Sequence, residues 1–380
     1  MKRTNSRPNA GRPIVPPVVF SSTFAFDSTA ELVTESGRLD SNFYSRYSNP
    51  TVRAAEEAIA KLEGAELSLC FASGMAAISA ALLGHLKQGD RILAQSALYG
   101  GAQGLMTKLL PRWGIATDFF PADELLRHFA RLRRPEHKLL YLESPVNPLV
   151  EMVDLRALAE QGRQAGMLVM ADATFATPLL QKSLALGADL VMHSTTKGLG
   201  GHSDLIGGVV SGKKKVMLPL WEARKLLGGS MEPMTAYLLW RGIQTLPARL
   251  ARQQQSALAV AKYLRANKKI ISVSYPGLKD YPQRALWRRQ MSGAGTMIAF
   301  DCGRSLKQTA TAVDRLRLIL NATSLGGTES LVSLPALTSH VSFKPADRRA
   351  LGITDGLVRL SIGMEEPAEL IADLKQAFRF

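Results

Sequence analysis

The chain has 380 residues, of which 46% are hydrophobic and 21% are charged, and its formal net charge is +15. These values exclude a disordered chain, which needs low hydrophobicity, and the 31 glycines lack the three-residue period of a collagen. We find no uncharged apolar run of about 18 residues and no apolar stretch after the basic start, so neither a membrane span nor a secretory leader is expected.

The chain contains two cysteines, Cys70 and Cys302. Two cysteines cannot build a disulfide framework or a four-cysteine zinc site, and we expect no metal. Each lies among apolar residues, where a thiol behaves as a small inert hydrophobe. The sequence therefore favours a protein of the reducing cytoplasm.

Residues 1–50 are predicted to form an irregular arm, because prolines punctuate them and Ser and Asn are frequent. From Val52 onward Ala55, Ile59 and Leu62 recur at helical spacing, and Gly64 is placed to cap the helix end. Helical stretches then alternate with short apolar runs, and one such helix is predicted over 155–164. Strands are expected at 91–94, 115–120, 139–142, 168–171, 190–192 and 209–210.

Short buried strands that alternate with helices indicate a mostly parallel sheet covered on both faces, the α/β class. Active sites of such sheets lie at the carboxyl ends of the strands. Residues 220–265 are helical and basic in character, and strands at 271–275, 297–300 and 357–361 precede a last helix over 367–378. We therefore predict an arm over 1–50, a large domain over 51–240 and a smaller α+β domain over 241–380.

Asp172 ends one predicted strand, and Lys197 follows the next strand 25 residues later. Both residues should lie on the same rim of the sheet. A lysine there is a candidate for Schiff-base chemistry, and an acid beside it could pair with a protonated pyridine nitrogen. On spacing alone, a surface lysine and a helix-capping aspartate are the simpler explanation of the pattern, and they are favoured over Schiff-base chemistry.

The turn Ser73-Gly74-Met75 opens an apolar helix. Free backbone N–H groups at a helix start bind phosphate, although most Ser-Gly turns of this kind are only caps.

Eight motifs in order along the chain resemble the Cys/Met-metabolism family of pyridoxal-phosphate (PLP) enzymes of fold type I. The motifs are Tyr44-Ser45-Arg46 with Asn49-Pro50-Thr51; Ser73-Gly74-Met75; Tyr99-Gly100-Gly101; Glu143-Ser144-Pro145 with Asn147-Pro148; Asp172 with Thr174-Phe175; His193-Ser194 through Asp204; Ser324-Leu325-Gly326-Gly327; and Arg359-Leu360-Ser361. The resemblance implies a PLP cofactor held in a large α/β domain, with a smaller C-terminal α+β domain.

The resemblance also implies roles for individual residues. Lys197 would bind the cofactor aldehyde and shuttle protons, Tyr99 would stack on the cofactor ring and act as an acid, and Asp172 would pair with the ring nitrogen. Gly74, Met75, Ser194 and Thr196 would hold the phosphate, and Tyr44 and Arg46 would reach the phosphate of a neighbouring subunit. Substrate would be bound by Arg359, Ser324 and Asn147.

Other polar residues in these motifs have simpler interpretations. We expect His193 to be a buried structural residue and His202 to be a loop residue. Glu143, at a strand end, is expected to brace the site.

The reaction is predicted to be the elimination of a thiol from a sulfur amino acid, giving a 2-oxo acid and ammonia. Family members that act on cystathionine usually carry charged residues at the positions of Gly104 and Thr323, and this chain would leave a distal carboxylate without a cation. We therefore favour methionine or a related substrate. The alternative is γ-replacement on an O-acylated homoserine.

The net charge also raises the possibility of a nucleic-acid-binding protein. No zinc finger, homeodomain or RNA-recognition motif is present, and the basic residues are scattered, so we expect neither a nucleic-acid nor a membrane partner. If Tyr44 and Arg46 serve a neighbour, the protein is a homodimer or homotetramer.

Overall fold

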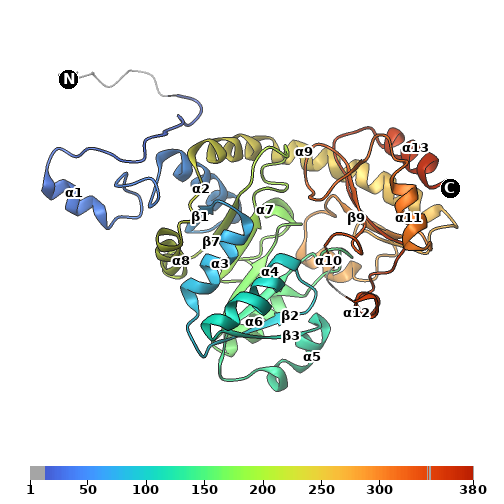
Figure 1. Cartoon of the computed structure of the whole chain (residues 1–380), viewed down its shortest axis with the longest axis horizontal. Helices are drawn as coiled ribbons and strands as arrows, with labels where there is room; N and C mark the ends of the chain where they lie inside the picture. The colour runs from blue at the N-terminus through green and yellow to red at the C-terminus, as the bar shows by residue number, and fades with distance from the viewer. Residues whose placement is uncertain (1–12, 340, 342–343, 380) are drawn as a thin grey trace.

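The computed structural model describes residues 13–339, 341 and 344–379, so the first twelve residues of the predicted arm lie outside the described part. Within that part, two sheets lie side by side and the long helix α9 (Pro233–Ala266) crosses from one to the other (Figure 1). The larger sheet has seven strands and the smaller has five.

The larger sheet is mostly parallel, as the strand pattern predicts. Across the sheet its strands follow the order β1 (Leu67–Phe71), β7 (Gly208–Gly212), β6 (Leu190–Ser194), β5 (Leu168–Asp172), β4 (His137–Glu143), β2 (Arg91–Gln95) and β3 (Ala116–Phe120). Six of these strands were predicted, whereas β1 was missed because its short run leads directly into the Ser73 turn. Only β7 is antiparallel to its neighbours, β1 and β6.

Helices cover both faces of this sheet. On one face Phe71, Met170 and Met192 form a core with α3 (Gly74–His85) and α8 (Lys214–Leu227). On the other face α2 (Pro50–Glu63), α5 (Ala122–Leu132) and α6 (Leu155–Gln164) supply the core residues. The sheet is therefore buried on both sides, which explains its nearly continuous apolar strands.

Helix α2 shows why the sequence predicts its elements well here. Asn49 caps the start, since its side-chain oxygen accepts from the Thr51 amide at 2.9 Å, and Pro50 occupies the first turn. Ala55 and Ile59 are fully buried. At the end Gly64 adopts the left-handed conformation with a φ of 69°, so the predicted cap is confirmed.

The smaller sheet lies near the C-terminus and is mainly antiparallel. Its order is β10 (Leu320–Asn321), β11 (Leu331–Ser333), β12 (Leu357–Ser361), β9 (Met297–Asp301) and β8 (Ser272–Ser274), with β10 and β11 parallel. Apolar residues of this sheet pack against the second half of α9, α11 (Leu306–Val313) and α13 (Pro367–Phe378). The last helix has the predicted bounds.

Helix α9 belongs to both parts of the molecule. Its 34 residues correspond to a length of about 50 Å. Leu239 and Ile243 enter the core around α2, whereas Val260 and Leu264 enter the core of the smaller sheet. The helix passes through residue 240 without a break. The domain boundary that we predict at that residue stays a prediction.

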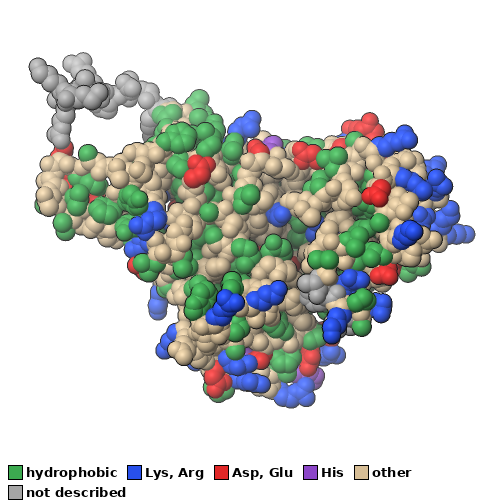
Figure 2. Space-filling view, viewed as in Figure 1, with side chains coloured by type: hydrophobic (Ala, Val, Ile, Leu, Met, Phe, Trp, Pro, Cys, Tyr) green, Lys and Arg blue, Asp and Glu red, His purple; other side chains and the backbone are tan. Residues whose placement is uncertain are grey.

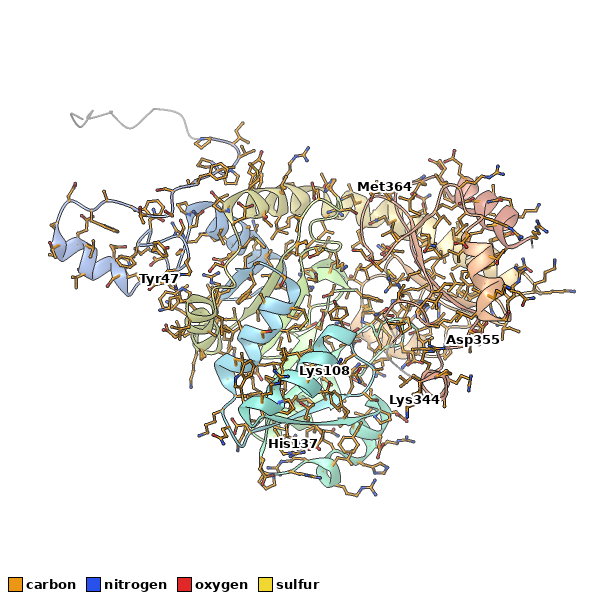
Figure 3. All side chains as sticks on the ribbon, in the orientation of Figure 1. Tyr47, Lys108, His137, Lys344, Asp355 and Met364 are labelled. Atoms are coloured by element: carbon orange, nitrogen blue, oxygen red, sulfur yellow. The ribbon has the colours of Figure 1, made fainter. Side chains whose placement is uncertain are left out.

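The arm projects away from both sheets (Figure 1). The expectation of a wholly irregular arm is wrong at α1 (Thr29–Ser36), a helix that Ser28 caps by accepting from the Glu31 amide. This helix has no buried residue. The arm joins the body at Tyr47 (Figure 3), whose carbonyl accepts from Trp221 Nε1 at 3.1 Å and from Arg224 Nη2 at 3.0 Å. The arm is therefore anchored at Tyr47, while its helix has no buried residue.

Shorter helices complete the described chain. They are α4 (Gly100–Gly104), a π-helical turn (Leu105–Leu109), a 3₁₀ turn (Leu110–Trp113), α7 (Thr177–Leu180), α10 (Arg284–Gln290) and α12 (Pro345–Ala350). Across residues 13–379, apart from the undescribed gaps, no helix is long and apolar enough to cross a membrane. Figure 2 shows Lys and Arg spread over the visible face with acidic residues among them, rather than gathered in one groove.

Candidate active site

A cavity of about 620 Å³ opens at the carboxyl ends of the central strands of the larger sheet. Strand β4 contributes Glu143, β5 contributes Asp172 and β6 contributes Ser194. Loops of the smaller sheet close it from the other side. Of the predicted site residues, the cavity is lined by Gly74, Met75, Tyr99, Asn147, Asp172, Ser194, Thr196, Lys197, Ser324 and Arg359.

Lys197 lies on the turn that follows β6, and its side chain enters the cavity. Its Nζ donates a hydrogen bond to Ser324 Oγ at 2.7 Å. Burial, together with the nearby positive charge of Arg359, lowers the pKa of Lys197 to about 8. At pH 7 roughly a tenth of this amine is therefore neutral and nucleophilic, far more than for a lysine with the ordinary pKa.

Asp172 is 6% exposed at the end of β5. Its Oδ1 accepts from the Thr174 amide at 3.0 Å and from Thr174 Oγ1 at 2.6 Å. Burial raises the pKa of Asp172, while the Thr174 hydrogen bonds and the charge of His193 oppose that rise. No cationic side chain forms an ion pair with Asp172 in the part of the chain that is described, so a ligand cation is the natural partner for this carboxylate.

Glu143 braces the site, as expected. Its Oε2 accepts from the Tyr99 amide at 2.7 Å and its Oε1 accepts from the Asn147 amide at 3.2 Å. Burial and the charge of Asp172 raise the pKa of Glu143 to about 8. One carboxyl group therefore fixes the backbone of two cavity residues.

Tyr99 presents its ring to the cavity and is 47% exposed. The ring lies against the backbone of the next turn, because a Cβ on Gly101 would come within 2.5 Å of Tyr99 Cε1 and 2.9 Å of Met75 Sδ. The second glycine of the Tyr-Gly-Gly motif thus makes room for the ring.

The start of α3 forms a tight cradle beside Ser194. Ser73 caps the helix by accepting from the Ala76 amide at 3.0 Å, and the first helical amides, at Gly74 and Met75, have no acceptor within the helix. A Cβ on Gly74 would lie 3.1 Å from Ser194 Cβ. This arrangement suits a phosphate group.

Arg359 comes from β12 and is 8% exposed. Its Nη1 donates to Asn147 Oδ1 at 2.9 Å and its Nη2 donates to the Ser324 carbonyl at 3.0 Å. Burial lowers the pKa of Arg359 to about 10. Among the described residues it has no carboxylate in an ion pair, so this guanidinium is available for a substrate carboxylate.

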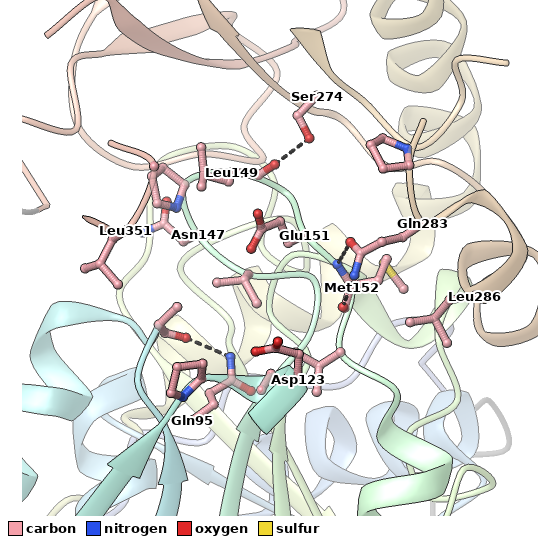
Figure 4. Close-up of a pocket in the computed structure, with 18 of the residues that line it drawn as sticks. Gln95, Asp123, Asn147, Leu149, Glu151, Met152, Ser274, Gln283, Leu286 and Leu351 are labelled. Atoms are coloured by element: carbon pink, nitrogen blue, oxygen red, sulfur yellow. Dashed lines mark hydrogen bonds between the residues drawn. The ribbon is translucent and has the colours of Figure 1, made fainter. Parts of the chain in front are cut away.

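A second cavity, of about 830 Å³, lies behind Asn147 (Figure 4). Asn147 lines both cavities. Within the lining of the second cavity, the Gln283 side-chain amide exchanges two hydrogen bonds of 2.7 Å with the backbone of Met152.

Tyr44 and Arg46 do not line the cavity of this chain. Both lie on the arm, where the Arg46 guanidinium packs over the rings of Tyr44 and Tyr47 and donates to the carbonyl of Lys225. Their position outside the cavity is compatible with service to a neighbouring subunit, and that role stays a prediction.

His193 is buried at 1% exposure and its Nε2 contacts Glu63, so it has the structural setting expected of it. His202 lies in a loop, where its Nδ1 hydrogen-bonds with the Gly200 carbonyl at 2.8 Å. Sequence reasoning gave no role to Thr174, which holds both Asp172 and the Ser194 amide. The Asp-x-Thr spacing, which allows a local turn bond, could have indicated it.

The residues present fit PLP. A phosphate cradle, an unpaired buried carboxylate and an amine with a lowered pKa face one cavity, which are the three features this cofactor requires. No group of three or more His, Cys, Asp or Glu residues is placed to hold a metal ion within the described chain.

Comparison with known proteins agrees with this fit. Residues 2–379 match the family described as Cys/Met metabolism PLP-dependent enzyme. The chain is 41% identical to cystathionine gamma-synthase 1 of Nicotiana tabacum, over 96% of this chain and 68% of that one. It is 38% identical to L-methionine gamma-lyase of Pseudomonas putida, over 97% and 93%. The structure of cystathionine gamma-lyase from Lactobacillus plantarum superimposes with a TM-score of 0.89 at 34% identity, covering 96% and 93% of the two chains.

Proposed function

Because the chain belongs to the Cys/Met metabolism PLP-dependent enzyme family, we propose that it is a carbon–sulfur lyase acting on methionine or a related amino acid. The products would be a 2-oxo acid, ammonia and a thiol. Enzymes of this family act on carbon–sulfur bonds in trans-sulfuration, and the finer assignment rests on the cavity.

The observation that carries the proposal is the charge of the cavity wall. Among the described lining residues, the Lys and Arg side chains are Lys197 and Arg359, and both have roles at the reacting end. Thr323 and Leu337 also line the cavity, whereas Gly104 does not. A substrate with a distal carboxylate would lose hydration there without gaining a cation, which is costly. An uncharged distal group, such as a thioether, avoids that cost.

The side chains divide the work as follows. Arg359 holds the α-carboxylate, and Asn147 and the Ser324 carbonyl fix the orientation of its guanidinium. Lys197 Nζ accepts the α-proton, and Ser324 Oγ keeps that nitrogen directed into the cavity. Tyr99 donates a proton to the departing sulfur. When bound, PLP would supply the electron sink, and Asp172 would hold its ring nitrogen.

A γ-replacement reaction is the second candidate. The tobacco relative is named a synthase, and it is 41% identical to this chain. The cavity of about 620 Å³ also has room for a thiol nucleophile beside a bound amino acid. Replacement would occur if a thiol, rather than a proton, reached the γ-carbon.

The proposal includes a homodimer or homotetramer. Tyr44 and Arg46 lie outside the cavity that holds Lys197, on an arm that extends away from its own subunit (Figure 1). In a symmetric pair, each arm would complete the site of the other subunit.

Steady-state assays with methionine, cysteine, cystathionine and O-acylhomoserines test the proposal. We expect 2-oxo acid and thiol to form from methionine, with weaker turnover of cystathionine. Turnover only of an O-acylhomoserine together with a thiol would assign replacement instead. As a control, Lys197→Ala should lose the visible absorbance of the lysine-linked cofactor, and survival of that absorbance would contradict the role of Lys197.

A further inference from the structure

Two glycine-rich loops meet at the catalytic amine. The lysine loop (residues 195–201) follows β6, and the serine loop (residues 323–327) connects β10 to β11. The loops touch so closely that a Cβ on Gly326 would lie 2.6 Å from the Gly198 nitrogen. Gly326 also has a φ of 77°, which favours glycine. The contact between Lys197 and Ser324 depends on this close approach.

Helix α9 holds the lysine loop through Arg249. The guanidinium is 4% exposed, and its Nη1 donates to the Gly198 carbonyl at 3.1 Å while its Nη2 donates to the Gly242 carbonyl at 2.8 Å. The helix can approach because Gly242 lacks a side chain, since a Cβ there would lie 2.2 Å from the Gly200 oxygen. One rigid fork thus ties the loop to the helix.

The same face of α9 also holds the serine loop. Gln253 lies four residues after Arg249, so the two side chains are neighbours on the helix. It is 2% exposed, and its Nε2 donates to the Gly327 carbonyl at 2.6 Å. One turn of helix therefore hydrogen-bonds to both loops. The side chains of these loops contact each other at Lys197 Nζ and Ser324 Oγ.

Burying the charged side chain of Arg249 here costs desolvation free energy. Burial lowers its pKa, and no carboxylate pairs with it among the described ion pairs. The equally buried Arg224 differs, because it pairs with Glu56 at 2.6 Å. Arg249 donates its hydrogen bonds to two carbonyls and one hydroxyl. These bonds fix the orientation of the guanidinium but do not neutralise its charge.

We infer that Arg249 and Gln253 are positioning residues that set the Lys197–Ser324 contact from one face of α9. We call the hydrogen bonds of Arg249 and Gln253 to the two loops the clamp. The clamp is a property of the protein without cofactor, and only the importance of the Lys197–Ser324 contact rests on the proposed function. Helix α9, which lies outside the cavity, thus aligns Lys197 and Ser324, two residues that come from different sheets.

The test uses cofactor-free full-length protein with Arg249→Met or Gln253→Met. Each change keeps an unbranched side chain and removes the donors. Hydrogen exchange should speed up by about tenfold at the amides of Gly200, Gly201 and Gly326, while amides in β5 stay protected. Arg252→Met is the matched control, because Arg252 lies on the same helix and bonds instead to Met364 and Glu365.

A second measurement follows the pH dependence of Lys197 acylation by mass spectrometry. The charged groups that share the cavity with Lys197 are Arg359, Asp172 and Glu143. Opening the loops should hydrate Lys197 and move the midpoint upward from about 8, toward the ordinary value of 10.5. Both clamp variants should show the shift, and Arg252→Met should not.

Arg249→Lys covers the case in which Arg249→Met does not fold, because it retains the charge and part of the donor capacity. We expect an intermediate shift. An unchanged midpoint and unchanged exchange in the folded clamp variants would overturn the inference, as would equal effects in Arg252→Met. Failure of the lyase assays alone would leave these readouts intact and would count only against the proposed function.

Discussion

Lys197 Nζ and Ser324 Oγ are 2.7 Å apart although 127 residues separate them in the chain. One residue follows a strand of the larger sheet, and the other lies in a loop of the smaller sheet. The proposed proton-transfer group is therefore oriented by a hydrogen bond that exists only when the two sheets are correctly packed.

Replacing Lys197 by Met should change stability in a pH-dependent way. The pKa of Lys197 is about 8 in the folded chain, against an ordinary value of 10.5. Between these values the unfolded chain binds more protons, so this lysine makes the wild type more stable as the pH rises. Urea unfolding of cofactor-free protein should show that any advantage of Lys197→Met at pH 7 shrinks by pH 10. An equal difference at both pH values would contradict the lowered pKa.

Replacing Arg359 by Ala should mainly raise KM. Loss of a charge-assisted pair costs about 1.5–3 kcal/mol, which corresponds to roughly a ten- to hundredfold weaker binding of the carboxylate. The matched comparison uses a substrate amide, which lacks the carboxylate. The amide should bind equally poorly to wild type and variant, and a further loss with the amide would show that Arg359 acts elsewhere.

Mixing two inactive variants tests the shared site. Arg46→Ala lacks a functional arm and Lys197→Ala lacks the amine, so each homodimer should be inactive. After dissociation and random reassociation, half of the dimers carry one intact site, and roughly one quarter of the wild-type activity should return. No recovery, with exchange of subunits verified by mass spectrometry, would place Arg46 outside the neighbour's site.

Replacing Thr174 by Val should weaken cofactor binding. The hydroxyl donates to Asp172 at 2.6 Å and accepts from the Ser194 amide at 3.0 Å, and its loss should raise the pKa of Asp172 further. A cost of about 1 kcal/mol implies roughly a five-fold higher dissociation constant for PLP. Thr174→Ser retains the hydroxyl and should bind like wild type. Equal weakening in both variants would implicate the lost methyl group instead.

The sequence predicts the large sheet well because its strands are short, apolar and separated by helices. Helix α6 and the last helix have the predicted bounds, and the local signals at Asn49 and Gly64 account for the success at α2. Strand β1 was missed because Leu67–Phe71 has no turn between it and the Ser73 cap. Strand direction at β7 depends on pairing partners far apart in sequence, which no local pattern records.

The candidate site was predicted through motifs rather than periodicity. Spacing placed Asp172 and Lys197 on one rim, but only the resemblance connected Arg359, Ser324 and Asn147 with them. The sequence gives no signal at Arg249 and Gln253, because a basic and a polar residue on a long helix are usually solvated. Their burial, 4% and 2% exposed, becomes evident only when both loops are in place.

Helix α9 contributes to the hydrophobic cores of both sheets. Its first half fills the core around α2 and its second half fills the core of the smaller sheet. Cutting the gene anywhere within 233–266 would leave one fragment with a bare apolar face. Neither sheet is thus a transferable module, and an exchange of C-terminal parts between relatives must carry the whole of α9 and match its contacts on both sides.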